Sequence, residues 1–193
     1  MKKLNYKFFL HLLFIISFSL NVSSDSSKLI KNLKIERGFS IEIFVENIET
    51  PRQIAESDSG NIFVGSRSGG IISVIDNNKN IRVIAKGLSN STGVTYHKGD
   101  LYFSEVNSIW KIPNVDEALL SSEQMPNKVL VTNNLPSDTH HGWKWIDFGP
   151  DNKLYVPVGA PCNICNPSLE EKYSFDKRYA SIMRLNDDNW EYV

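Results

Sequence analysis

Short runs of alternating apolar and polar residues recur along most of this chain, and turns rich in Gly, Asn and Asp separate them. The run Phe39 to Val45 alternates with a period of two, which is typical of a half-buried strand. After it, one unit occurs three times: a strand, a turn, a second strand, a loop and a third strand. We predict these strands at 53–57, 62–65 and 71–75, then at 93–97, 101–104 and 108–112, and finally at 143–148, 154–158 and 181–185.

A further short apolar segment follows each of the first two units, at 81–85 and 128–131, so each unit is expected to carry four strands. The turns contain Gly, Asn and Asp because hairpin turns require residues that tolerate positive φ. Four short strands that repeat every 40–50 residues are typical of a β-propeller. A β-sandwich is the alternative, but it would not explain the recurring phrase G-[ND]-[IL]-[FY]-[VF]. One short helix is expected, at 116–122.

The number of units is small for a closed ring, because a propeller needs about four or more blades. The segment Asn189 to Val193 is interpreted as the beginning of a new strand. We therefore expect an all-β chain that holds about half to two-thirds of a propeller, the N-terminal portion of a longer protein. Dimerisation that completes the ring is the alternative.

The N-terminal residues have the pattern of a secretory signal peptide. Lys2, Lys3 and Lys7 precede the apolar run 8–20, and small residues stand at the expected cleavage site after Ser24. A membrane anchor is the alternative, although the run is short for a span of about 20 residues. We predict a signal peptide at 1–24, a partial propeller at 25–193, a periplasmic or secreted protein, and no membrane span after cleavage.

The charge of the mature chain excludes one class of partner. Removal of residues 1–24 takes three lysines and no acids, so 18 basic residues remain against 22 acidic ones. The chain has no basic cluster of the kind that neutralises phosphates, and nucleic acid is not expected as a partner.

Paired histidines, His140 and His141, precede the third unit. Histidine can take a proton near neutral pH, and His141 is the candidate catalytic base because it stands before a strand and outside its apolar stripe. A loop histidine that stabilises a turn is the alternative. His140 is expected to point elsewhere, towards solvent or a supporting hydrogen bond.

The two cysteines stand close together, as Cys162 and Cys165. A disulfide that stiffens the loop after Val158 is favoured, because the expected compartment is oxidising. It would close a very small loop, so its stabilisation should be modest. A zinc half-site would need further ligands at regular spacing, and a redox pair would need a βα context that the pattern lacks.

Trp143 and Trp145 alternate along one predicted strand and should share a face. Core packing is the favoured interpretation, and a pocket wall for a flat ring or a sugar is the alternative. Asp138, Asp147 and Asp151 are interpreted as turn or capping residues.

The run H-G-W-K-W-I-D-F-G-P-D-N-K-L-Y-V-P-V-G-A-P-C-N-I-C, followed later by Y-A-S-I-M-R-L-N, resembles the glucose/sorbosone dehydrogenase family. The phrases P-R-Q-I-A-E-S-D-S-G-N-I-F-V-G-S-R-S-G and G-V-T-Y-H-K-G-D-L-Y-F-S-E are similar to it as well. These matches extend from about Gly38 to Asn186. His140 replaces the Asp that precedes the base in the glucose dehydrogenase branch, which points to the sorbosone-dehydrogenase-like branch.

The resemblance implies a six-bladed propeller that binds pyrroloquinoline quinone (PQQ) and calcium and oxidises a sugar. The family's base stands eight residues before the Gly of G-P-D, and here this residue is His141, with Gly149 as the Gly. The implied reaction transfers hydride from a sugar hydroxyl carbon to the quinone while His141 takes the proton, and an external acceptor then removes the electrons. By the same resemblance, the main cofactor and calcium ligands belong to later blades, so no cofactor-binding or metal residue is assigned in this chain.

Two other functions were weighed. A non-catalytic secreted propeller that binds a glycan or a protein would need no base at His141. A propeller lactone hydrolase would need carboxylate and Asn metal ligands around the axis, and the sequence offers no convincing set.

Overall fold

The computed structural model describes residues 26–121, 125–164, 177–186 and 189–193. The chain forms two compact units, Met1–Ile43 and Phe44–Val193. The signal peptide expected at 1–24 lies outside the described residues, so it stays a prediction. Among the helices in these ranges, none is long and apolar enough to cross a membrane.

The described part of the first unit contains one helix, α1 (Ser26–Ile30). The strand expected at 39–45, which runs across the boundary between the two units, is absent, and this prediction was wrong. Its apolar side chains are exposed, with Phe39 at 76%. Alternation supplies one apolar face, but a strand also needs a backbone partner, and no described strand pairs with this segment.

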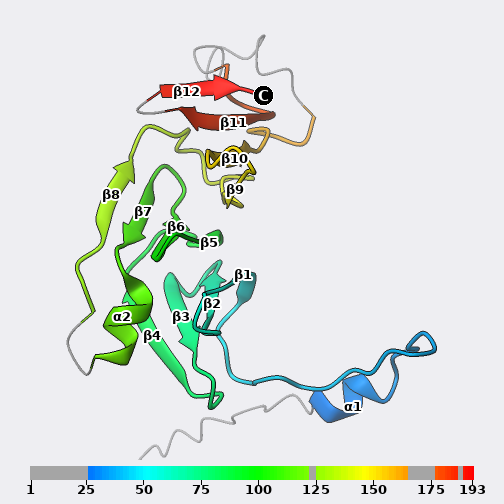
Figure 1. Ribbon diagram of the computed structural model, residues 1–193. Coiled ribbons are helices and arrows are strands. Elements are labelled where there is room, and N and C mark those ends of the chain that lie inside the picture. Colours follow the sequence, from blue (N-terminus) through cyan, green and yellow to red (C-terminus); the bar gives the residue numbers. More distant parts are fainter. Residues whose placement is uncertain (1–25, 122–124, 165–176, 187–188) are drawn as a thin grey trace, which may run out of the picture. The chain divides into compact units, whose positions relative to one another are not determined.

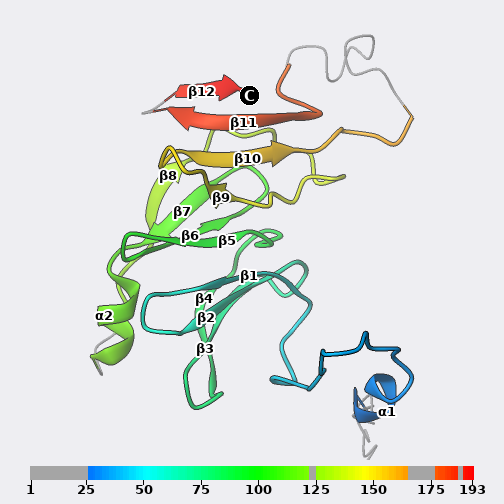
Figure 2. The same cartoon turned by 45° about the vertical axis from the view of Figure 1, so that its right-hand side comes forward.

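The second unit contains three antiparallel four-stranded sheets, in each of which strands adjacent in sequence pair with one another (Figures 1 and 2). The first sheet is β1 (Pro51–Glu56), β2 (Ile62–Ser66), β3 (Ile71–Ile75) and β4 (Ile81–Lys86). The second is β5 (Val94–His97), β6 (Asp100–Ser104), β7 (Ile109–Ile112) and β8 (Val129–Thr132). The third is β9 (Asp147–Phe148), β10 (Leu154–Val158), β11 (Ser181–Asn186) and β12 (Asn189–Tyr192). These sheets are the four-stranded blades of a β-propeller, as the sequence predicts.

One strand prediction in the third blade needs correction. The strand expected at 143–148 is reduced to β9, because only its last two residues pair with β10. The strand expected to begin at 189 is present as β12, which pairs with β11 as the fourth strand of the third blade. The helix expected at 116–122 is present as α2 (Val115–Leu120).

The hairpin turns have the backbone conformation that their residues suggest. Lys98 and Gly99 form the two-residue turn between β5 and β6, and both have positive φ, at 51° and 89°. Gly60 and Asn152 supply positive φ in the turns before β2 and β10. Turns of this hand match the right-handed twist of the paired strands.

The core lies between the sheets. One cluster joins the first blade to the second and includes Phe63, Ile72, Leu101 and Phe103, all of which are fully buried. A second cluster joins the second blade to the third through Ile109, Leu135, Ile146, Leu154 and Val156. Face-to-face packing of neighbouring sheets therefore holds the three blades together.

One polar side chain joins all three blades. The side-chain amide of Gln53, on β1, donates to the carbonyl oxygen of Ile146 at 2.7 Å. Its carbonyl oxygen accepts from the backbone nitrogens of Val94 at 3.3 Å and Ile146 at 3.2 Å. Gln53 is buried, so these bonds are made away from water. The inner strands are thus linked by a side chain where no backbone ladder connects them.

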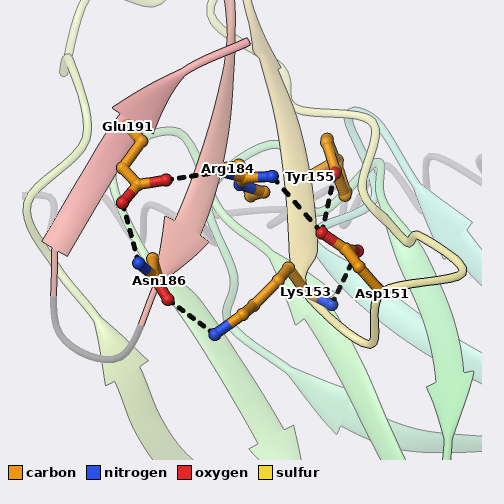
Figure 3. A network of polar contacts seen from close by, with 6 residues as sticks. All are labelled: Asp151, Lys153, Tyr155, Arg184, Asn186 and Glu191. Carbon is orange, nitrogen blue, oxygen red and sulfur yellow. Dashed lines mark hydrogen bonds and ion pairs between the residues drawn. The ribbon is translucent and has the colours of Figure 1, made fainter.

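In the third blade, a network of six polar side chains joins the turn before β10 to the hairpin of β11 and β12 (Figure 3). The six residues are Asp151, Lys153, Tyr155, Arg184, Asn186 and Glu191. The Arg184 guanidinium is central, because it donates to Glu191 at 2.7 Å and to Asp151 at 3.4 Å. These groups are partly exposed, so their role is to align the outer strands.

Candidate functional site

Three connections bring the chemically distinctive residues together. Arg67 lies between β2 and β3, Ala160 between β10 and β11, and His141 and Trp143 lie in the segment before β9. The guanidinium carbon of Arg67 is 4.0 Å from the centroid of the Trp143 ring. The Trp143 ring lies 6.3 Å from the His141 ring in an edge-on arrangement. We call His141, Trp143 and Arg67 the His141 site.

The backbone around His141 is tightly packed. His141 has a left-handed conformation, with φ at 51°, in a turn that the hydrogen bond from Gly142 N to Thr139 O closes at 3.1 Å. A Cβ atom at Gly142 would collide with the carbonyl of Asp138, and one at Gly159 would collide with the carbonyl of His141. Because these two residues have no side chain, the backbone on either side of His141 can pack closely and hold it in place.

The tautomer of His141 follows from one contact. Its Nδ1 lies 3.0 Å from the carbonyl oxygen of Ala160. A carbonyl oxygen can only accept a hydrogen bond, so Nδ1 carries the hydrogen of the neutral ring and Nε2 keeps a lone pair. The side chain is half-buried and lies in a loop, and this contact favours the tautomer in which Nε2 can accept a hydrogen bond.

His140 has a different environment. Its side chain is exposed, as expected for a histidine directed to solvent. Its ring nevertheless remains next to His141, with the ring centroids 4.1 Å apart and the planes inclined by 41°. His140 therefore covers one side of the candidate base.

The core-packing interpretation of the two tryptophans was wrong. Trp145 is 52% exposed and Trp143 is half-buried, whereas Lys144 and Ile146 between and after them are buried. Ile146 belongs to the cluster between the second and third blades, and Gln53 binds its backbone. These contacts direct the side chains of Lys144 and Ile146 into the interior, so the two tryptophans lie on the opposite, more exposed face of the segment.

Lys144 is a polar residue that the sequence analysis did not single out. It is 1% exposed, and its ammonium donates to the carbonyl of Gly142, the residue that follows His141. Burial lowers the pKa of Lys144 from 10.5 to about 8, because the interior disfavours the charged form. A lysine between two tryptophans is typical of a solvated position, and no signal in the sequence distinguishes it from one.

Each of the three aspartates accepts a hydrogen bond, and the partners of Asp138 and Asp147 are distant in the sequence. Asp151 accepts from the backbone nitrogen of Lys153 at 3.2 Å, which confirms a turn residue. Asp147 accepts from the Thr95 hydroxyl at 2.8 Å and so joins the second and third blades. Asp138 accepts from the Tyr179 hydroxyl at 2.5 Å.

Cys162 follows β10, and Cys165 lies outside the described residues, so the disulfide stays a prediction. In the ranges that the structure describes, no group of three or more His, Cys, Asp or Glu side chains is arranged to hold a metal ion.

We compared the chain with known proteins. No family model matches it. An uncharacterised protein of Borreliella burgdorferi is 33% identical over 167 residues, which are 82% of this chain and 43% of the relative. The PQQ-bound aldose sugar dehydrogenase of Streptomyces coelicolor superposes with a TM-score of 0.55 at 20% identity, over 77% of this chain and 48% of that one. The PQQ domain of the Coprinopsis cinerea pyranose dehydrogenase superposes with a TM-score of 0.59 at 18% identity, over 76% and 36%.

These matches bear on the fold and on its extent. The chain spans less than half the length of the curated relative and of each of these two structures. At about 20% identity, the structural likeness concerns the course of the backbone. Three consecutive four-stranded blades superpose on the sugar dehydrogenases, in agreement with the resemblance found in the sequence. The chain therefore has the β-propeller fold of the PQQ-dependent sugar dehydrogenases.

Proposed function

We propose that this chain carries the catalytic base of a quinone-dependent sugar dehydrogenase, and that this base is His141. The observation that supports the proposal is the contact between Nδ1 of His141 and the carbonyl of Ala160. It leaves Nε2 able to accept a proton and holds the ring in one orientation, as the orienting group does in other histidine-based sites.

In the proposed reaction, a sugar hydroxyl approaches Nε2 of His141 and loses its proton to that atom. The carbon that bears the hydroxyl loses a hydride, so the C–OH group becomes a C=O group and two electrons and two hydrogens leave the sugar. PQQ, when bound, supplies the acceptor for the hydride. The resulting imidazolium keeps its Nδ1–H bond to the Ala160 carbonyl, which stabilises the added charge.

Two neighbours of His141 shape the place where the sugar would bind. Trp143 presents a half-buried indole next to the histidine, and aromatic faces suit both sugars and flat rings. Arg67 covers that indole with a cation. An indole and a cation fit part of an acidic, planar cofactor such as PQQ. Among the described residues, no group of three or more His, Cys, Asp or Glu side chains is placed to hold the calcium ion that the resemblance implies.

Export is part of the proposal and rests on the basic and apolar N-terminal pattern, which lies outside the described residues. In that compartment the reduced cofactor would pass its electrons to an external acceptor. The protein would then meet both the sugar and the acceptor outside the cytoplasm.

The test is to express the natural reading frame and measure dye-linked oxidation of aldoses with added PQQ and calcium. We expect activity in the wild type and a decrease in kcat of roughly 10²- to 10⁴-fold in His141→Ala, because a general base is lost. His140→Ala is the matched control, since it removes the adjacent imidazole, and it should keep most of the activity.

The alternative function makes the opposite prediction. If the protein is a propeller that binds a glycan without changing it, no sugar is oxidised under any of these conditions, and His141→Ala leaves glycan binding unchanged. Equal activity of the wild type and His141→Ala would also reject His141 as the base.

A further inference from the structure

Within the ranges that the structure describes, two tryptophans have a cation stacked on the ring. Lys128 lies over Trp110, with its ammonium 3.9 Å from the ring centroid, and Arg67 lies over Trp143 at 4.0 Å. The first pair lies in the second blade, and the second pair belongs to the His141 site. The two arrangements therefore allow a direct comparison within one molecule.

The pair at Trp110 is completed by a carboxylate. The Trp110 indole nitrogen donates to Oε2 of Glu105 at 2.6 Å, and the Lys128 ammonium lies 3.7 Å from the same oxygen. The cation and the indole N–H thus share one acidic acceptor. Hydrogen bonds and ion pairs of this kind stabilise one another when the cation rests on an aromatic face.

The pair at Trp143 lacks this third member. Among the described residues, Arg67 forms no ion pair, and its side chain has no hydrogen-bond acceptor. The same part of the chain offers no acceptor for the Trp143 indole N–H. A half-buried guanidinium and an indole N–H are therefore available next to His141.

We propose that Arg67 and Trp143 bind a carboxylate of the ligand that His141 acts on or beside, in the place that Glu105 takes at Trp110. This inference rests on the proposed function. A guanidinium presents paired N–H donors that match the two oxygens of a carboxylate, whereas a neutral sugar hydroxyl matches one. The ligand carboxylate belongs either to the quinone cofactor, which carries several, or to an acidic sugar such as a uronic acid.

The experiment measures binding, so its result does not depend on turnover. The protein from the natural reading frame is titrated with PQQ and with the PQQ trimethyl ester by equilibrium dialysis, and with glucuronate and glucose by calorimetry. The variants are Arg67→Met, which removes the charge, and Arg67→Lys, which keeps the charge and loses the paired donors. Lys128→Met is the matched control, because it removes the cation from the other tryptophan.

We expect Arg67→Met to weaken one of the acidic probes by roughly tenfold to a hundredfold, Arg67→Lys to weaken it less, and Lys128→Met to leave it unchanged. A loss of PQQ binding, with the ester already weak in the wild type, assigns the carboxylate to the cofactor. A loss of the preference for glucuronate over glucose assigns it to the sugar.

The proposal is overturned if the wild type binds the acid and its neutral counterpart equally in both pairs, or if Arg67→Met binds both acids as the wild type does. The comparison of each acid with its neutral counterpart uses the wild type alone, so equal affinity in both pairs overturns the proposal even if the variants do not fold. Carboxylate binding without sugar oxidation would reject the proposed function and keep this site.

Discussion

The position of His141 depends on the residues packed around it, and Gly159 is one of them. A Cβ atom at position 159 would collide with the His141 carbonyl, so Gly159→Ala must displace the loop or the histidine. We expect a decrease in kcat of about tenfold or more, because misplacement of about 1 Å can cost that much. Steady-state kinetics would measure it, and an unchanged kcat with an intact fold would show that the loop adjusts freely.

The lowered pKa of Lys144 predicts that the free energy of unfolding depends on pH in an unusual way. Its pKa is about 8 in the folded state, against an ordinary value of 10.5, so between these pH values the unfolded chain binds the proton and the folded chain does not. The free energy of unfolding therefore increases from pH 8 to pH 10.5. A pKa difference of one corresponds to about 1.4 kcal/mol, so the total increase is on the order of 3 kcal/mol.

Urea unfolding at several pH values would measure this effect. The variant Lys144→Met, which is similar in size, has no proton to lose, so the increase should disappear in it while the remaining pH dependence is kept. A wild type and a variant with parallel pH profiles would contradict a buried, deprotonating Lys144.

At the scale of the element, the hairpin of β5 and β6 depends on its two turn residues. Gly99 has φ at 89°, and an added Cβ would have only Asn114 nearby, at 3.8 Å. Gly99→Val should therefore destabilise the protein by about 1–2 kcal/mol through backbone strain alone. Lys98→Asn should be neutral or slightly stabilising, because Asn tolerates the left-handed conformation. Urea unfolding of the two variants provides the check. The midpoint of Gly99→Val should be lower than that of the wild type, and the midpoint of Lys98→Asn should be equal to it or slightly higher.

The strands and the candidate site differ in how far the sequence predicts them. Strands such as β2, β3 and β6 follow from short apolar runs that turns rich in Gly, Asn and Asp separate, because turn chemistry is local. The segment before β9 was assigned the wrong inner face, since in W-K-W-I both faces carry an apolar residue and a shift of one position exchanges them. His141 could be found by its residue type and position. Its acceptor, Ala160, could not, because that contact joins separate loops.

At the scale of the whole molecule, Gln53 makes the three blades depend on one another. Gln53→Leu would leave the backbone groups of Val94 and Ile146 without partners in the interior, at a cost of about 1–3 kcal/mol for each group. We expect a large decrease in the urea midpoint, with one transition shared by all blades in the wild type.

The control for this prediction is Gln53→Glu. Glutamate keeps an acceptor for Val94 and loses the donor to the Ile146 carbonyl, so it should also destabilise the protein, and more strongly above the pKa of its carboxyl. A wild type that unfolds in separate steps, or variants with unchanged midpoints, would show that packing alone joins the blades.

The reach of Gln53 also bears on how the protein is made. Its amide partner, Ile146, lies 93 residues later in the chain, and a ribosome adds roughly 5–20 residues per second. For about 5–20 seconds after Gln53 is synthesised, its side-chain amide nitrogen has no final partner. In this state the nascent chain exposes the side-chain amide of Gln53, which is buried in the folded protein, together with apolar faces that the later blades cover. We therefore expect the first two blades to stay in a loose, chaperone-accessible form until the segment around His141 has emerged, so that the candidate site and the fold are completed in the same step.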